Sequence, residues 1–444
     1  MRALHFLTLG LLAWTHVGWG LFVRVARRLG LGRVTDDRES RAAAATADAG
    51  PAGEATFGEA ATPAPASVSG SSSGAPVAFT EAGPSGFGPG PEATSSTVAP
   101  RPLVSVVIAA YAEEDAIAQT VAGLAAQTWP RERLQIVVAC DGSTDRTAER
   151  ARAAGADLVL ELPRGGKHHA QAGGVAQATG AILAFSDANT SWEPTALEEL
   201  VAAFDDPRVG YACGRVAFLA EDGATNQEGA YWKLEMALRR LESDWWSVTA
   251  GNGAIYALRA ELWSQLRVQF GHDLALPHQV VRAGLLAVDR PTAKASEPMV
   301  PSIDGEWRRK RRMMNQAWRV VLRGGEGGGL RQGILDPTGL PIPYLLAIVS
   351  HRWLRYASPF LHLLAYAAGL ALLLARGRRT PLHVLLLAAH LAVPLGAAAA
   401  SRFPWRPLLL CRYYVLMTAS IAAGLSDHLR HGTPAGWDPA EGTR

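Results

Sequence analysis

Acidic side chains follow three separate apolar stretches of this sequence. Glu113 comes just after VSVVIAAY, Asp141 ends LQIVVACD, and Asp187 ends AILAFSD. Apolar runs of this length, separated by amphipathic segments, are typical of buried parallel strands in βαβ units. Because ligands of open α/β sheets bind beyond the carboxyl ends of the strands, these acids are expected to share one site.

Asp187 and Asn189 are candidates for holding a divalent cation. Their spacing of two places both side chains on the same side of an extended segment. Carboxylate and amide oxygens suit Mg²⁺ or Mn²⁺, which keep other positions for water and substrate phosphates. The alternative is that Asp187 only caps a following helix. A phosphate held by a Gly-rich loop is not expected, because the sequence has neither GxGxxG after the first strand nor GxxxxGK[ST].

The elements that position these residues alternate between strand-like and helix-like patterns. Helices are predicted at 113–127 and 143–155, among others. This alternation predicts an α/β fold with a mostly parallel sheet covered by helices on both faces. The predicted strands are 104–111, 134–141, 157–162, 181–187 and 209–218.

The composition excludes several classes of protein. The chain has 444 residues, of which 48% are hydrophobic, so it can build a sizeable core. A net charge of +3 gives no general attraction to nucleic acid, and no nucleic-acid partner is expected. Cys140, Cys213 and Cys411 are far apart, which argues against a disulfide scaffold or a cysteine zinc site.

An uncharged apolar run at residues 3–23 is long enough to cross a hydrocarbon core of about 30 Å. Four arginines follow it between residues 24 and 33, and only Arg2 precedes it. The positive-inside rule then places the following chain in the cytoplasm. A cleaved signal peptide would carry its charge before the apolar core, so an uncleaved transmembrane anchor is expected over residues 1–30.

The remaining segments outside the α/β region differ sharply in composition. Residues 31–100 are dominated by Ala, Gly, Pro and Ser and are expected to form a disordered linker. Residues 326–430 are apolar again and are followed by a tail at 431–444. Within them we expect an interfacial helix and about three transmembrane helices, whose orientation the charges leave open, at 339–356, 357–375, 381–400 and 407–425.

Seven segments, taken in order, resemble the membrane-bound branch of the family 2 glycosyltransferases, related to cellulose and hyaluronan synthases. They cover about residues 101–320. The resemblance implies a GT-A domain over residues 101–325, a nucleotide-sugar donor and an inverting transfer. The segments are VSVVIAAYAEEDAI, LQIVVACDGSTDRT, GGKHHAQAGG, ILAFSDANT, EGAYWKLEMALRRLES, GNGAIYALR and HDLALPHQVVRAGL.

The resemblance also implies roles for single residues. Tyr111, Glu113 and Asp141 would hold the uridine of the donor, and Lys167 would reach the donor from its Gly-Gly-Lys segment. The alternative for Lys167 is a solvated loop position. Asp187 would bind the metal, with Asn189 where the family often has a second Asp.

The same resemblance makes Asp273 the general base. An acceptor hydroxyl must lose its proton as it attacks the anomeric carbon, and a carboxylate within hydrogen-bond reach can take it. From the residues alone, Asp273 is equally the N-cap of the helix that follows, and both roles can hold together.

Weaker candidates lie near the acceptor and near the membrane. Asn252 and Gly253, in a segment resembling the acceptor-side loop, are possible acceptor contacts. Arg309 and Arg312 lie in a basic segment that either faces the diphosphate of the donor or rests on anionic lipid. The family's Gln-x-x-Arg-Trp motif lacks its Gln and Trp here, which puts processive polymer synthesis in doubt. The preceding helix, 228–243, carries an apolar stripe that predicts core packing: Tyr231, Leu234, Leu238 and Leu241.

The sequence also departs from the family motifs beside the key acids. Ala112 and Ala172 stand where Asn is usual, Cys140 replaces an Asp, and His272 replaces an acid. Because Asp141, Asp187 and Asp273 are all present, activity is still expected.

These patterns together predict a glycosyltransferase of the bacterial inner membrane with its catalytic domain in the cytoplasm. It would use Mg²⁺ or Mn²⁺ and a nucleotide-sugar, expected to be UDP-linked, to extend a glycan or lipid acceptor for cell-surface polysaccharide or glycolipid. Two alternatives stay open. One is transfer of a single sugar to polyprenyl phosphate or diacylglycerol, and the other is a non-catalytic membrane scaffold.

Overall fold

The computed structural model describes residues 1–32, 101–219, 227–266, 271–298, 303–323, 333–375 and 380–434. The predicted linker and most of the predicted tail lie outside the described residues. Apart from Arg101, the described residues all belong to one compact unit, Met1–Val34 with Pro102–Arg444.

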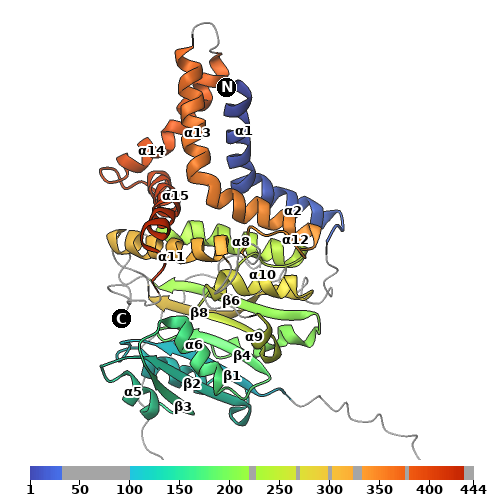
Figure 1. Ribbon diagram of the computed structural model, residues 1–444, viewed down its shortest axis with the longest axis vertical. Coiled ribbons are helices and arrows are strands. Elements are labelled where there is room, and N and C mark those ends of the chain that lie inside the picture. The colour runs from blue at the N-terminus through green and yellow to red at the C-terminus, as the bar shows by residue number, and fades with distance from the viewer. Residues whose placement is uncertain are drawn as a thin grey trace, which may run out of the picture. The chain divides into compact units, whose positions relative to one another are not determined.

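An eight-stranded sheet forms the centre of the α/β domain, which we define as residues 101–323 (Figure 1). The strands lie in the order β3-β2-β1-β4-β7-β6-β8-β5. Their bounds are β1 Val104–Ala110, β2 Leu134–Asp141, β3 Leu158–Leu162, β4 Ile182–Asp187, β5 Ser191–Trp192, β6 Val209–Leu219, β7 Ile255–Arg259 and β8 Leu286–Pro298.

The sheet has two groups of parallel strands that one antiparallel strand joins, and the short strand β5 pairs antiparallel with β8 at one end of the sheet. Strands β1 to β4 pair in parallel, as the sequence predicts, and β6 and β8 also pair in parallel. Strand β7 lies between β4 and β6 and is antiparallel to both. Neither β7 nor β8 is predicted from the sequence. The second half of the GNGAIYALR segment, which resembles the family's acceptor-side loop, is a central strand, because it pairs with β4 and β6.

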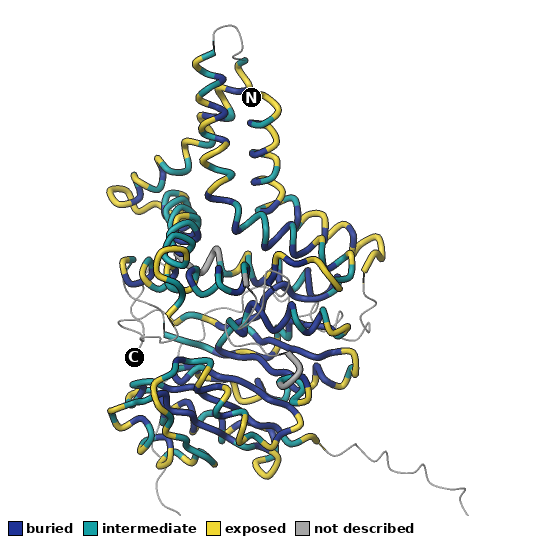
Figure 2. Tube along the Cα trace, in the orientation of Figure 1, coloured by how far each residue is buried: buried dark blue, intermediate teal, exposed yellow. Residues whose placement is uncertain are grey.

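Helices cover both faces of this sheet, which confirms the predicted α/β fold. One apolar cluster joins the sheet to α4, α5 and α7, and a second joins it to α10 and α11. The strands are accordingly buried along most of their length (Figure 2). The helices are α4 Ile117–Ala125, α5 Thr147–Ala153, α6 Lys167–Ala176, α7 Ala196–Val201, α8 Gln227–Trp245, α9 Ala260–Leu266, α10 His272–Arg282 and α11 Ile303–Arg323.

The apolar stripe predicted on α8 is only partly a core face. Leu238 and Leu241 pack against buried Trp19 and Val23 of the N-terminal helix, as expected. Leu234 is 60% exposed, so its prediction as a core residue is wrong. The buried face of α8 instead carries polar side chains such as Arg239 and Glu242.

Four helical segments are long and apolar enough to cross a membrane: Arg2–Arg28, Ile342–Leu374, Pro381–Ala399 and Arg406–His431. The first consists of α1 Arg2–Ala13, η1 Trp14–Gly18 and α2 Trp19–Arg28. The second consists of α12 Ile342–Ala347, η5 Ile348–Trp353 and α13 Leu354–Leu374, and the last two are α14 and α15. The interfacial helix expected at 339–356 and the span expected at 357–375 therefore form one continuous helical segment.

The last of these helices, α15, also docks on the α/β domain. The Trp318 indole N–H of α11 donates to the Ile421 carbonyl at 2.8 Å, and Arg311 pairs with Asp427 at 2.6 Å. Because α15 uses one side for these contacts, its length and composition alone do not make it a membrane span.

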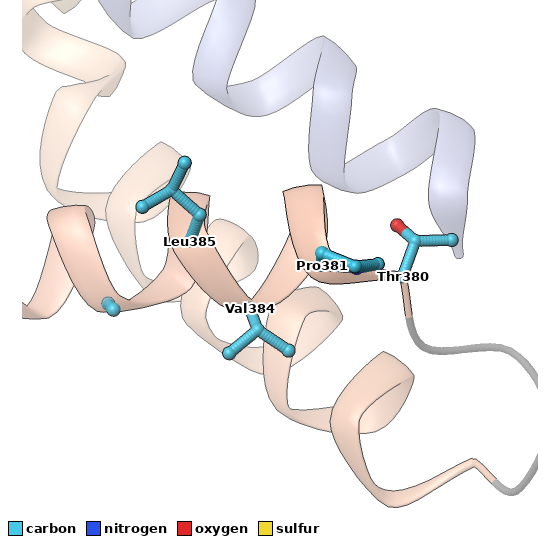
Figure 3. Close-up of a pocket in the computed structure, with 5 residues that line it drawn as sticks. Thr380, Pro381, Val384 and Leu385 are labelled. Atoms are coloured by element: carbon cyan, nitrogen blue, oxygen red, sulfur yellow. The ribbon is translucent and has the colours of Figure 1, made fainter.

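An open hollow lies at the start of α14 (Figure 3). Four of its five lining residues are apolar, and it contains none of the residues predicted for the functional site. The lining residues are Thr380, Pro381, Val384, Leu385 and Ala388.

Candidate active site

The predicted strand-end residues meet at one edge of the sheet. Parallel register sets Asp187 of β4 beside Ala109 of β1, and Cys140 of β2 beside Ala110. Strand β7 runs the other way, so it begins at this edge, where Ile255 pairs with Ser186. This direction explains why the residues just before β7 reach the site although they belong to a distant part of the chain.

Asp141 is completely buried and anchors a glycine loop. Its carboxylate accepts hydrogen bonds from the backbone N–H groups of Gly165 at 2.7 Å and Gly166 at 2.9 Å. It also pairs with the Arg164 guanidinium at 2.9 Å. Gly166 has φ +97°, a conformation that favours glycine, and it precedes the first residue of α6. Asp141 therefore fixes the segment that presents Lys167.

Arg164 is a site residue that the sequence interpretation missed. Its guanidinium lies over the ring of Tyr111, 3.2 Å from the ring centroid, while it pairs with Asp141. Arginine commonly stacks on aromatic faces, so this contact fixes the guanidinium between Tyr111 and Asp141. The only sequence signal is that Arg164 immediately precedes the Gly-Gly-Lys segment.

The loop after β1 is held by the loop after β2. Backbone N–H groups of Ala112 and Glu113 donate to the Ser143 hydroxyl at 3.1 Å and the Thr147 hydroxyl at 2.9 Å. Ala112 has φ +52°, in the left-handed region where Asn and Gly are favoured over Ala. This conformation gives a physical reason for the Asn that the family usually has at this position. Glu113 itself is 8% exposed.

Lys167 is not a solvated loop residue. Its ammonium forms an ion pair with the Asp187 carboxylate, and Asp273 and Glu297 also lie within its electrostatic range. Burial opposes the charged ammonium, but Asp187 outweighs it, so the pKa of Lys167 is raised. The Lys167 ammonium therefore interacts electrostatically with three carboxylates, which come from β4, α10 and β8.

Glu297, near the end of β8, is a second residue that the sequence interpretation missed. It accepts a hydrogen bond from the Thr190 hydroxyl at 2.6 Å. Burial, together with the negative charge of Asp187, raises the pKa of Glu297 to about 7. The site thus holds more negative charge than Lys167 alone balances.

The donor set at Asp187 fits a hard divalent cation. Lys167 already places a positive charge against this carboxylate, and the raised pKa of Glu297 reflects an excess of negative charge. Within the described parts of the chain, no three His, Cys, Asp or Glu residues are grouped to hold a metal. A metal here would therefore draw its remaining ligands from water and the donor's phosphates, as Mg²⁺ commonly does.

The position of Asn189 differs from the expectation. Strand β4 ends at Asp187, and residues 188–189 form a turn, so the two side chains do not share one extended segment. The expectation that the Asp187 and Asn189 side chains lie on the same side of one strand is therefore wrong. Asn189 as a metal ligand stays a prediction.

Asp273 lies in the first turn of α10 and not at its N-cap, which is Gly271 with φ +57°. The carbonyl of Asp273 accepts the Gly251 N–H at 2.7 Å. Burial raises the pKa of its carboxyl group, although the Lys167 ammonium opposes this effect. A carboxylate with a raised pKa is the type of group that accepts a proton near neutral pH.

Asn252 and Gly253 lie beside these residues but differ in what they contact. The Asn252 amide donates to the Gly214 carbonyl at 2.6 Å and accepts from Ile255 N–H at 2.8 Å, so it fixes the start of β7. Gly253 faces the lysine, since a Cβ at this position would be 3.6 Å from Lys167 Nζ. Of these two residues, Gly253 is therefore the one that faces a ligand that would bind at Lys167.

The two predicted arginines of α11 are less central. Arg309 makes a bidentate pair with Glu306, at 2.8 and 3.1 Å, and lies within electrostatic range of Glu297. Arg312, almost one turn further along the helix, is half-buried. Donor binding by either arginine stays a prediction.

The membrane-type segment Ile342–Leu374 holds the chain just before Gly251. The Tyr344 hydroxyl donates to the Val248 carbonyl at 3.3 Å, and Arg352 Nε donates to the Thr249 hydroxyl at 2.9 Å. Gly251, two residues further on, contacts Asp273. A short run of backbone therefore connects a membrane-type helix with the candidate base.

Comparisons with known proteins agree with this geometry. Residues 105–260 match the sequence model of the family described as Glycosyl transferase family 2. The chain is 32% identical over 132 residues to Glycosyltransferase AglE of Haloferax volcanii, covering 29% of this chain and 43% of AglE. It is 30% identical over 123 residues to Probable glycosyltransferase YdaM of Bacillus subtilis, covering 26% and 29%. The matched region thus spans less than half of either relative.

A solved structure extends the likeness to most of the fold. The mannosyltransferase PcManGT from Pyrobaculum calidifontis, in complex with GDP-Man and Mn²⁺, superposes with a TM-score of 0.55 at 24% identity. The match covers 75% of this chain and 88% of that one. At this identity the likeness supports the fold alone. Residues 105–260 thus match a glycosyl transferase family 2 domain in sequence, and the fold is a GT-A-like α/β sheet.

Proposed function

We propose that this protein is an inverting, divalent-metal-dependent glycosyltransferase that moves a sugar from a nucleotide-sugar to a hydroxyl group of a membrane-associated acceptor. The observation that carries the proposal is the position of Lys167. Its ammonium pairs with Asp187 and lies in electrostatic range of Asp273. A cation for a departing diphosphate and a base for an incoming alcohol are thus neighbours.

The donor's base would bind beside Tyr111 and Arg164, which adds a planar donor group, on the loop that buried Asp141 fixes. The diphosphate would extend toward Lys167 and Asp187. A bound Mg²⁺ or Mn²⁺ would neutralise negative charge on the leaving diphosphate. Lys167 would add a second positive charge at the same place.

The transfer then needs one bond to form as another breaks. The acceptor oxygen attacks the anomeric carbon, the bond from that carbon to the diphosphate oxygen breaks, and the nucleoside diphosphate leaves. Asp273 accepts the hydroxyl proton, which its raised pKa favours. Attack from the face opposite the leaving group inverts the anomeric centre.

Two features support an acceptor that arrives from a membrane. Four segments could cross a bilayer by length and composition, and Ile342–Leu374 contacts the backbone that leads to Gly251 and Asp273. A cytoplasmic orientation of the domain follows from the arginines after residue 23. A polysaccharide or glycolipid precursor fits this placement, and transfer of a single sugar to a lipid is the competing version.

A donor screen tests the proposal. The full chain in lipid nanodiscs, with Mn²⁺ and an extract of membrane lipids, is given UDP-sugars and GDP-mannose in turn, and nucleotide release is measured. At least one donor should give release that Asp273→Asn lowers by about 10²–10⁴-fold. Asp205→Asn, at an exposed position, is the matched control. Binding of nucleotide without release for any donor would favour the scaffold alternative, and the length of the product separates polymer from single-sugar transfer.

A further inference from the structure

We propose that His168 is a positioning residue that ties the donor loop to the general base. The inference rests on the proposed function, because it concerns how Asp273 is held for proton transfer. The family motifs assign no role to His168.

The contact that carries the inference joins two segments far apart in sequence. The backbone N–H of Gly271 donates a hydrogen bond to Nε2 of His168 at 2.9 Å. Gly271 is the N-cap of α10, and Asp273 is in the first turn of that helix. The rings of His168 and His272 also lie close together, with centroids 4.4 Å apart. His168 therefore contacts both residues that precede the base.

The hydrogen bonds require one tautomer of His168. Nε2 can accept the Gly271 N–H only if it carries no proton, so the proton sits on Nδ1. Nδ1 lies 3.1 Å from the Gln171 Oε1 atom, which accepts it. Burial lowers the pKa of His168 to about 4, so the ring is neutral at pH 7.

Gly271 has a conformation that glycine adopts at little cost. Its φ is +57°, and a Cβ here would lie 2.8 Å from the Val320 side chain. Because glycine populates other conformations just as readily, its contacts must select this one. The bond to His168 is one such contact, and the bond from Gly251 N–H to the Asp273 carbonyl is another.

His168 directly follows the residues that contact the other two aspartates of the site. Gly165 and Gly166 bind Asp141, and Lys167 pairs with Asp187. His168, the next residue, binds the turn that carries Asp273. The four consecutive residues 165–168 thus contact Asp141, Asp187 and the turn just before Asp273. Movement of this segment when the donor binds would reach Asp273 through His168.

The test compares three variants in the full chain. His168→Ala removes the acceptor, His168→Gln places an amide oxygen near the position of Nε2, and His169→Ala removes an exposed imidazole from the same turn. His168→Ala should lower kcat about 10- to 100-fold with little change in KM for the donor, because misplacing a catalytic group by about 1 Å costs up to about 10². His168→Gln should restore most of kcat, and His169→Ala should match the wild type.

Hydrogen exchange supplies a readout that does not need activity. Without donor, the peptide containing residues 271–276 should exchange at least about 10-fold faster in His168→Ala than in the wild type, and near the wild-type rate in His168→Gln. Equal exchange in His168→Ala and the wild type overturns the inference. So does a fall in kcat that His168→Gln fails to restore. If the wild type transfers no sugar but exchange responds as stated, the proposed function fails while the support of Gly271 by His168 stands.

Discussion

Lys167, the first residue of α6, forms an ion pair with Asp187, the last residue of β4. The pair occupies the carboxylate that is expected to bind the metal. A metal that bound Asp187 would therefore compete with Lys167 for this carboxylate.

Lys167→Met should separate metal binding from catalysis. With the ammonium gone, Asp187 is left unpaired, so Mn²⁺ should bind at least as tightly as in the wild type, while nucleotide release falls about 10²-fold. Asp187→Asn should lose both. Mn²⁺ binding is followed by electron paramagnetic resonance, with exposed Lys294→Met as the control. Weaker Mn²⁺ binding in Lys167→Met would show that the lysine does not compete.

The pH dependence of transfer should follow Asp273. This residue works as a base only when ionised, and burial raises the pKa of its carboxyl group. Activity is therefore lost as pH falls through the raised value, which lies above the ordinary Asp pKa of about 3.9. We expect the acidic limb of kcat/KM above the ordinary Asp pKa, with donor binding measured separately at each pH. A limb at or below the ordinary Asp pKa would contradict this assignment.

Arg164→Ala should weaken donor binding more than it slows the chemical step. The guanidinium contacts Tyr111 and Asp141, which are expected to hold the nucleotide. Arg164 is distant from Asp273 in sequence and does not belong to the helix that carries Asp273. We expect the Kd for the nucleoside diphosphate to rise about 10-fold, equivalent to about 1.4 kcal/mol. Calorimetry measures it, and Arg152→Ala, at an exposed ion pair, is the control. An unchanged Kd would remove Arg164 from the donor site.

Ala112→Asn should stabilise the domain. Ala112 has φ +52°, where Asn is tolerated better than Ala, so the substitution should add about 0.5–1 kcal/mol. Thermal unfolding of the purified protein should shift upward. Ala122→Asn, on the exposed side of α4, should shift it slightly downward, because Asn is a weaker helix former than Ala. A downward shift for both would mean that the loop after β1 does not keep this conformation.

Glu242→Gln should loosen the contact between the N-terminal helix and the α/β domain. The fully buried carboxylate accepts hydrogen bonds from Trp19 at 2.9 Å and Thr249 at 2.8 Å, and lies 2.8 Å from a His351 ring nitrogen. An amide offers one accepting oxygen in place of two, and breaking such a buried network costs about 3–5 kcal/mol. Thermal stability should drop clearly, whereas Glu261→Gln at an exposed position should have no effect. Equal stabilities would mean that the network contributes little.

The sequence was sufficient for the parts of the site that depend on local pattern. Strands β1 to β4 have continuous apolar runs, and the ends of those strands carry Asp141 and Asp187, whose convergence follows from parallel pairing. The central place of β7 depends on partners far away in the chain, so its five residues could not be recognised locally. The extended segment expected to hold both Asp187 and Asn189 is wrong, because the strand ends at Asp187 and residues 188–189 form a turn.

Other site residues could not be predicted because their roles depend on loop geometry. Arg164 and His168 flank a recognisable Gly-Gly-Lys segment, but nothing local says that one stacks on Tyr111 and the other accepts the Gly271 N–H. Glu297 lies at the end of a strand whose polar sequence gives little signal. In each case the decisive contact comes from a residue that is distant in sequence.

The antiparallel strand β7 joins two parts of the sheet that are formed by different segments of the chain. Residues 104–187 build one part without interruption, and residues 191–298 build the other. The residues expected to recognise the nucleotide all belong to the first part, while Asp273 and the backbone beside it belong to the second. Recombination at this seam could exchange the recipient of the sugar and leave recognition of the activated sugar unchanged.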